Sequence, residues 1–202
     1  MSKKRLEFLK LTVMCAEGKL EEIKAVLGSS KPEIDEFFLL ETAAEYGQLE
    51  VLEYLYSRNG FLYHSYLMVH FATRNGHLEV LKWLDAHGVN VCNQYELCIA
   101  AQHGHLEIVE WLISKGVDPH AYRNDTIHSA VIGGHLEVVK FLVETANIVQ
   151  SVDELFCLAA RRGHVDVMKY LASRGANINS GAGNPLYLAS QNGQLEAVKD
   201  AP

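Results

Sequence analysis

Four histidines recur at nearly equal intervals along this chain of 202 residues, and histidine is a common zinc ligand. They are His77, His105, His135 and His164. A zinc site needs three or four ligand atoms within about 2 Å of one ion, whereas packed helices lie about 8 to 10 Å apart. A column of histidines at this spacing does not gather enough ligands, so we expect no metal site. We expect each imidazole instead to bind backbone groups at its own turn.

Residues suited to other chemistry do not form a recognisable motif. The sequence lacks GxxxxGK and GxGxxG, which bind phosphates, and GxSxG and HExxH, which carry a nucleophile or a zinc-bound water. Cys98 and Cys157 stand among apolar neighbours, and a reactive thiol needs exposure and a positive environment. We therefore expect both cysteines to pack in the core, and we predict no catalytic residue, no enzyme activity and no cofactor.

The four histidines belong to a four-residue motif of the type GHLE, which recurs through the whole chain. Its glycines follow one another at spacings of 29, 29, 28, 30, 29 and 30 residues, at Gly18, Gly47, Gly76, Gly104, Gly134, Gly163 and Gly193. A unit of this size cannot bury its own apolar face and must stack on its neighbours, as in a solenoid. The last unit is incomplete, because KDAP stands where the pattern requires an aromatic residue and a leucine.

Each unit contains two predicted helices joined by a tight turn. In GHLEVVKFLV, which begins at Gly134, the apolar residues fall on one face of a helix. The segment before each glycine also has a helical pattern, and small residues four positions ahead of the glycine predict a close packing seam, at Ala43, Ala72, Ala100, Ala130, Ala159 and Ala189. We expect the repeat glycine to end the first helix in a left-handed conformation.

Several segments resemble the ankyrin repeat, whose pattern is TPLHxAAxxGHLEVVxxLLxxGADVN. The resemblance is strongest in LAARRGHVDVMKYLASRGANIN at 158–179, NPLYLASQNGQLEAV at 184–198 and DTIHSAVIGGHLEVVKFLV at 125–143. It covers almost the whole chain and implies an all-α solenoid of about seven repeats, forming one domain over residues 1–202. The usual ankyrin period is about 33 residues, so we expect short loops in place of β-hairpin fingers. Short units with this sequence pattern are similar to ankyrin repeats of giant DNA viruses and amoeba-associated organisms.

The resemblance implies a non-enzymatic scaffold that binds a protein partner through the concave surface of its first helices and the adjacent loops. The two residues before each repeat glycine match the positions that face this groove, and they vary between units while the framework recurs. The candidates are Glu45, Tyr46, Arg74, Asn75, Gln102, His103, Ile132, Arg161, Arg162, Gln191 and Asn192. Further candidates in the loops are Tyr63, Tyr66, Tyr122 and Arg123. The aromatic residues from Phe61 to Tyr66 are also expected to cover the core.

Charge and hydropathy argue against two other classes of partner. The net charge of −7 divides into −4 through Ala101 (10 basic, 14 acidic residues) and −3 beyond it (8 basic, 11 acidic), so no basic half exists to contact nucleic acid. No apolar run approaches the roughly 20 residues that span a membrane. The four cysteines form no CxxC pair and we find no export signal, so we expect a cytoplasmic or otherwise intracellular protein, including one inside a host cell.

Self-association remains an alternative to scaffold function. The incomplete last repeat would leave apolar residues uncovered, namely Leu186, Leu188, Leu195 and Val198. A second copy of the chain stacked on this repeat would cover them.

Overall fold

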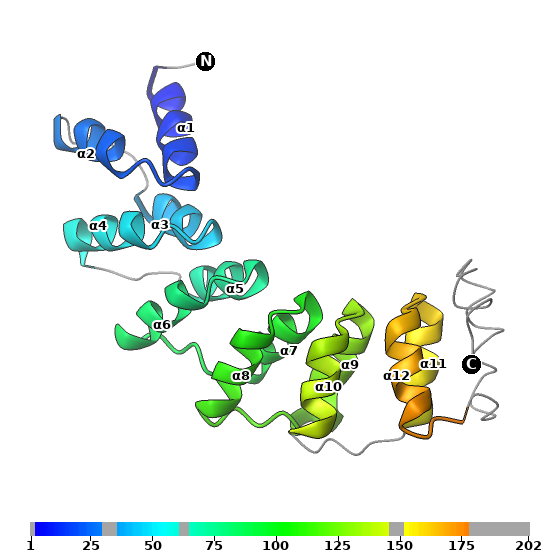
Figure 1. The fold of residues 1–202 in the computed structure, drawn as a ribbon. Helices are drawn as coiled ribbons and strands as arrows, with labels where there is room; N and C mark the ends of the chain where they lie inside the picture. Colours follow the sequence, from blue (N-terminus) through cyan, green and yellow to red (C-terminus); the bar gives the residue numbers. More distant parts are fainter. Residues whose placement is uncertain (1–2, 30–35, 61–64, 146–151, 178–202) are drawn as a thin grey trace. The chain divides into compact units, whose positions relative to one another are not determined.

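The computed structural model describes residues 3–29, 36–60, 65–145 and 152–177, and in these ranges it is helical without strands (Figure 1). The helices are α1 (Lys3–Ala16), α2 (Leu20–Ser29), α3 (Glu36–Glu45), α4 (Leu49–Asn59), α5 (Ser65–Asn75), α6 (Leu78–Ala86), α7 (Gln94–His103), α8 (Leu106–Ser114), α9 (Ala121–Gly133), α10 (Leu136–Glu144), α11 (Val152–Arg162) and α12 (Val165–Ser173). The all-α fold expected from the repeat is confirmed.

The chain divides into two compact units, residues 1–91 (unit 1) and residues 92–202 (unit 2). Unit 1 contains α1 to α6, and unit 2 contains α7 to α12. The single domain expected from the continuous repeat stays a prediction.

Each repeat pairs an odd-numbered helix, which we call the inner helix, with the even-numbered outer helix that follows it. In unit 1 the inner helices α1, α3 and α5 pack in a row, and in unit 2 α7, α9 and α11 do the same (Figure 1). The outer helices α2 and α4, and α8, α10 and α12, form a second row behind them. This two-layer stack is the arrangement that short amphipathic helices need to bury their apolar faces.

Small side chains lie where the inner helices approach one another. The predicted seam alanines within the described residues are fully buried, at Ala43, Ala72, Ala100, Ala130 and Ala159. The outer helices contribute larger aliphatic groups to the same core, and Val138, Val139 and Leu142 of α10 are 1%, 0% and 0% exposed. The helical face expected after each repeat glycine is therefore the buried face.

The turn between the two helices of a repeat is closed by backbone hydrogen bonds at the glycine. At Gly104, φ is 78°, and its N–H donates to the carbonyl of Ala101 at 3.3 Å. The next N–H, of His105, donates to the carbonyl of Ala100 at 3.0 Å. These two bonds satisfy carbonyls at the end of the inner helix, and the left-handed conformation they require is easy only for glycine. The predicted left-handed turn is confirmed.

The side chain that follows the repeat glycine connects adjacent repeats. The Nε2 atom of His135 lies 2.9 Å from the carbonyl oxygen of Gln102, in the preceding repeat, and so donates its hydrogen to it. His164 makes the same bond to Ile132 at 2.9 Å, and His77 makes it to the Glu45 carbonyl at 2.9 Å. In these three cases the bond joins a turn to the turn of the preceding repeat. Our expectation that each imidazole serves its own turn was wrong in this respect, because the ring reaches backward and caps nothing in its own helix.

The imidazole also occupies the space that a side chain at the previous repeat glycine would need. A Cβ atom built on Gly47 would lie 2.5 Å from Nδ1 of His77, and one built on Gly104 would overlap the ring of His135. The repeat glycine is therefore needed for its backbone conformation and also because the next repeat packs directly on its Cα.

The loops between repeats are short where the structure describes them. The segments 87–93 and 115–120 contain no strand, so the two connections have no β-hairpin finger, as expected from the short period. In the second of these loops Gly116 adopts a φ of 93°, with open space around the position of a Cβ atom.

Alanine substitution of two glycines separates the requirement for a left-handed backbone from the requirement for space at the Cα atom. Gly116→Ala should cost about 1 to 2 kcal/mol of unfolding free energy, because only the left-handed conformation is penalised. Gly104→Ala should cost about 1 to 3 kcal/mol more, because its Cβ also overlaps the His135 ring. Urea denaturation measures both values. In a His135→Ala background the excess cost at Gly104 should shrink, and an unchanged excess would show that the ring is not its cause.

Candidate functional site

The candidate site is the exposed surface at the carboxyl ends of the inner helices, where the paired residues before each repeat glycine lie. Each pair occupies the last turn of an inner helix or the residue just after it. The fold fixes these positions because the turn at the next glycine is closed and the following histidine ties the turn to its neighbour.

In unit 1 the two pairs are brought together on neighbouring helices. Tyr46 is 52% exposed, and Arg74 and Asn75 are also exposed, whereas Glu45 is half-buried. The Nδ2 amide of Asn75 donates to the Glu45 carbonyl at 3.0 Å, beside the bond from His77. Asn75 therefore has a structural role between the repeats, while Tyr46 and Arg74 present their side chains to solvent.

In unit 2 three neighbouring inner helices carry the remaining described pairs. Gln102 is exposed on α7, and His103 is half-buried with Nδ1 3.1 Å from the carbonyl of Ile99. Ile132 on α9 is half-buried, and Arg161 and Arg162 at the end of α11 are both exposed. The arginines thus form the charged part of this surface, although cations at a helix carboxyl end also favour the helix dipole.

Several candidates differ in position from the expectation or lie outside the described residues. Tyr66 is not in a loop but near the start of α5, and it is 66% exposed, so it does not cover the core. The backbone of Tyr122 and Arg123 belongs to the first turn of α9 rather than to a loop. Their side chains lie outside the described part of the chain, as do Tyr63, Gln191, Asn192 and the apolar residues of the last repeat.

Sequence reasoning missed a groove across the inner helices α7 and α9 of unit 2. Most of its lining residues carry a hydrogen-bonding group, and they are Asn93, Gln94, Tyr95, Cys98, Asp125, His128, Ser129 and Ile132. Tyr95 is 61% exposed at its edge, and Nε2 of His128 lies 3.9 Å from an oxygen of Glu154 on α11. Side chains of this kind can hydrogen-bond a peptide backbone or a polar side chain.

The environments of Cys98 and Cys157 do not activate their thiols. Burial raises the pKa of the Cys98 thiol, and hydrogen bonds from Thr126 and Gln94 only partly oppose the increase. Burial also raises the pKa of Cys157, which is 8% exposed. Both thiols are therefore protonated near neutral pH, which makes them poor nucleophiles. Cys157 is buried as expected, whereas Cys98 is only half-buried and lines the groove. Within the described ranges, no group of three or more His, Cys, Asp or Glu side chains could hold a metal ion.

The outer helices carry a recurring row of aromatic residues. Their aromatic residues seven positions after the repeat glycine are half-buried, at Tyr54, Trp83, Trp111, Phe141 and Tyr170. Cationic groups lie over three of these rings, with the Lys115 ammonium 5.7 Å from the centre of the Trp111 ring as an example. These three rings are therefore engaged by cations of the chain itself.

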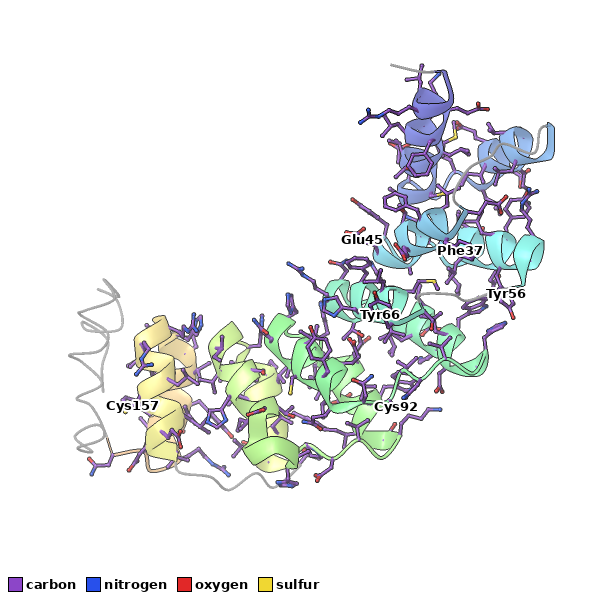
Figure 2. All side chains as sticks on the ribbon, turned by 180° about the vertical axis from the view of Figure 1, so that it is seen from behind. Phe37, Glu45, Tyr56, Tyr66, Cys92 and Cys157 are labelled. Atoms are coloured by element: carbon purple, nitrogen blue, oxygen red, sulfur yellow. The ribbon has the colours of Figure 1, made fainter. Side chains whose placement is uncertain are left out.

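Large apolar side chains are exposed on the inner helices of unit 1, and of these Tyr66 was a predicted candidate whereas Phe37 was missed. Figure 2 labels Phe37 on α3 and Tyr66 on α5, which are 36% and 66% exposed. The signal that could have found them is the pair of positions nine and ten residues before the repeat glycine. In this unit those positions hold apolar residues throughout, at Phe8, Leu9, Phe37, Phe38, Tyr66 and Leu67.

Comparison with known families gives matches along most of the chain. A model for ankyrin repeats in three copies matches residues 69–153 and 151–200, and a model for ankyrin repeats in many copies matches residues 40–84. Alpha-latrotoxin-Lh1a of Latrodectus hasselti is 38% identical over 61 residues, 29% of this chain and 4% of the toxin. An ankyrin repeat protein of Acanthamoeba polyphaga mimivirus is 32% identical over 77 residues, 33% of this chain and 36% of the viral protein. The chain thus covers less than two thirds of either relative, and the expected resemblance to giant-virus repeats is confirmed.

A search for membrane spans among the described helices finds none of sufficient length and hydrophobicity.

The histidine that joins two repeats makes the stability of unit 2 depend on pH. Burial lowers the pKa of His135 below the ordinary 6.5, nearby His103, His105 and His164 lower it further, and the hydrogen bond to Gln102 partly opposes the change. A lowered pKa means that the unfolded chain takes up the proton first. The contribution of His135 is therefore complete above pH 6.5 and is lost as the pH falls through 6.5 towards the lower folded-state value.

The His135→Gln variant tests this pH dependence, because glutamine can make the same hydrogen bond without titrating. Gln48 occupies the same repeat position and donates from Nε2 to the Ala16 carbonyl at 3.0 Å. The glutamine variant should keep most of the stability at pH 7.5 and lose less than the wild type between pH 7.5 and 5.5. His135→Ala should lose about 0.5 to 1.5 kcal/mol at pH 7.5 through the missing hydrogen bond. Urea titrations at several pH values measure this, and equal pH slopes for wild type and His135→Gln would contradict the assignment.

Proposed function

The chain belongs to the ankyrin repeat family, and we propose that it binds a partner protein on the exposed face of its inner helices. Ankyrin repeats are generally protein–protein interaction modules and are typically non-enzymatic. The proposal assigns this role to the residue pairs before the repeat glycines and assigns no catalytic step to the chain.

The observation that carries the proposal is a contrast between two sets of positions in the same repeat. The seam alanines, repeat glycines and linking histidines recur and are engaged in packing or hydrogen bonds. The paired positions before the glycine have side chains as different as Tyr46, Arg74 and Gln102, and these three are exposed. Stacking does not require any particular residue at the exposed positions, so they are free to suit a partner.

Arg161 and Arg162 are the pair with the clearest chemical preference. Both are exposed at the end of α11, and neighbouring arginines can each form a two-pronged hydrogen bond with a carboxylate. Arginine is also among the residues that contribute most at protein interfaces. The pair favours an acidic segment of the partner at this end of the inner-helix face.

Reversing the charge of this pair tests the proposal. The Arg161→Glu, Arg162→Glu double variant should lose a partner that the wild type captures from cell lysate, because the acidic segment would be repelled. Quantitative mass spectrometry of the two captures measures the loss. Helicity and melting are compared first, because acidic residues at a helix carboxyl end cost about 0.3 to 1 kcal/mol each.

A Lys115→Glu, Lys140→Glu double variant is the matched control, since it changes the net charge equally but at the C-cap of the outer helix α8 and on the outer helix α10. Partners lost only with the arginine variant support recognition by the inner face. Equal losses with both variants would point to overall charge, and captures that neither variant alters would count against a role for the arginine pair.

A further inference from the structure

Large exposed apolar side chains are concentrated on the inner helices of unit 1. They are Leu6, Leu9 and Val13 on α1, Phe37 and Phe38 on α3, Tyr46 at the end of α3, and Tyr66 on α5, with exposed fractions from 36% to 66%. In the described part of unit 2, only Tyr95 belongs to this class. Clustered apolar groups on a protein surface mark interaction sites far more often than scattered ones do.

The repeat register shows that stacking does not impose this difference. The positions nine and ten residues before the repeat glycine hold Phe8, Leu9, Phe37, Phe38, Tyr66 and Leu67 in unit 1. The same positions in unit 2 hold Gln94, Tyr95, Asn124, Asp125, Asp153 and Glu154. Because polar residues are accepted at equivalent positions of the same framework, the apolar residues of unit 1 are not needed to build it.

An aromatic contact joins the apolar residues of two neighbouring helices in unit 1. The ring centres of Phe8 on α1 and Phe38 on α3 are 5.4 Å apart, which is direct aromatic contact. Leu9 occupies the repeat position of Phe38, so it lies beside this contact on the packed helices α1 and α3. We call the surface of Leu9, Val13, Phe37, Phe38 and Tyr46 the aromatic face.

Charge on α3 indicates which residues would complement the aromatic face. The helix contains glutamates at 36, 41 and 45 and no basic residue. Arg58 binds Glu36 at 3.3 Å, so that carboxylate is already neutralised. Glu45 lies seven residues after Phe38, which is two turns further along the same side of the helix, and it directly precedes Tyr46. A lysine or arginine placed there would meet a carboxylate together with aromatic rings, which attract cations.

We propose that the aromatic face docks a short peptide segment of a protein partner in which large apolar side chains flank one lysine or arginine. This inference rests on the proposed function and narrows it, because it specifies the chemistry of a second contact distinct from the arginine pair on α11. Aromatic side chains that are exposed before binding and buried on binding are typical of the residues that dominate interface energies.

Selection from a random peptide library displayed on phage tests the proposal with the full chain as bait. Enriched peptides should combine apolar residues with a lysine or arginine. A selected synthetic peptide, measured by fluorescence anisotropy, should bind the Leu9→Ser, Phe38→Ser variant at least about tenfold more weakly. Far-UV circular dichroism and urea unfolding verify the fold, and Tyr46→Ser is a second variant should the first one unfold.

A charge exchange tests the basic residue separately. Glu45→Lys should weaken the selected peptide several-fold, and a peptide with glutamate in place of its lysine or arginine should bind Glu45→Lys better than it binds the wild type. No enrichment, enriched peptides without a basic residue, or affinities unaffected by the serine and lysine variants would overturn the proposal. Loss of binding to vesicles of phosphatidylserine and phosphatidylcholine in the serine variant, with no peptide enriched, would overturn it in favour of a membrane surface.

The Arg161→Glu, Arg162→Glu variant separates this inference from the proposed function. Peptides or proteins that are lost with the arginine variant but retained by the serine variant would leave the proposed function standing and overturn the aromatic face as a docking site. Binding lost with neither variant would count against both.

Discussion

The hydrogen bond from an imidazole to the carbonyl of the preceding repeat is the contact on which the stack depends. His135 reaches Gln102 in this way, and the ring rests on the bare Cα of Gly104. The accepting carbonyl lies at the end of an inner helix, where carbonyls have no partner within the helix itself. One side chain thus satisfies a helix end, fixes the distance between turns and excludes any side chain at the glycine. Gln48, which donates to Ala16 from the same position, shows that the requirement is an N–H donor of suitable reach.

The same turn couples local structure to tertiary packing. The carbonyl of Ala100 accepts a hydrogen bond from the His105 N–H in the closed turn, and the methyl group of Ala100 lies in the seam between inner helices. A larger residue would separate the helices and thereby lengthen the histidine bond, while a residue other than glycine at 104 would open the turn. These positions constrain one another, which explains why they recur together while adjacent positions change.

The repeat period of the sequence explains which structural features could be predicted and which could not. It located the helices, the seam and the left-handed glycines, because each requires one residue type at a fixed spacing. It could not report which repeat a histidine side chain contacts, since both choices produce the same spacing. The start of α9 was placed too late because His120 provides no side-chain cap, whereas Asn93 caps α7 by accepting from the Glu96 N–H at 3.1 Å. Phe37 and Phe38 were not among the predicted surface residues, because apolar type alone does not distinguish a buried ring from an exposed one.

Nearest-neighbour stacking explains why one framework can carry two surface chemistries. Each repeat contacts only the repeats beside it, so a residue that avoids the seam and the turn affects no other part of the stack. Phe38 and Asp125 occupy equivalent positions nine residues before their glycines, and both are exposed. The stack therefore accepts either residue type, although Phe38 also gains its ring contact with Phe8. Exposed aromatic rings carry a cost in solubility that aspartate does not, and this cost is offset only when a partner covers them. Residue differences at equivalent exposed positions are thus better indicators of recognition than the recurring residues that identify the fold.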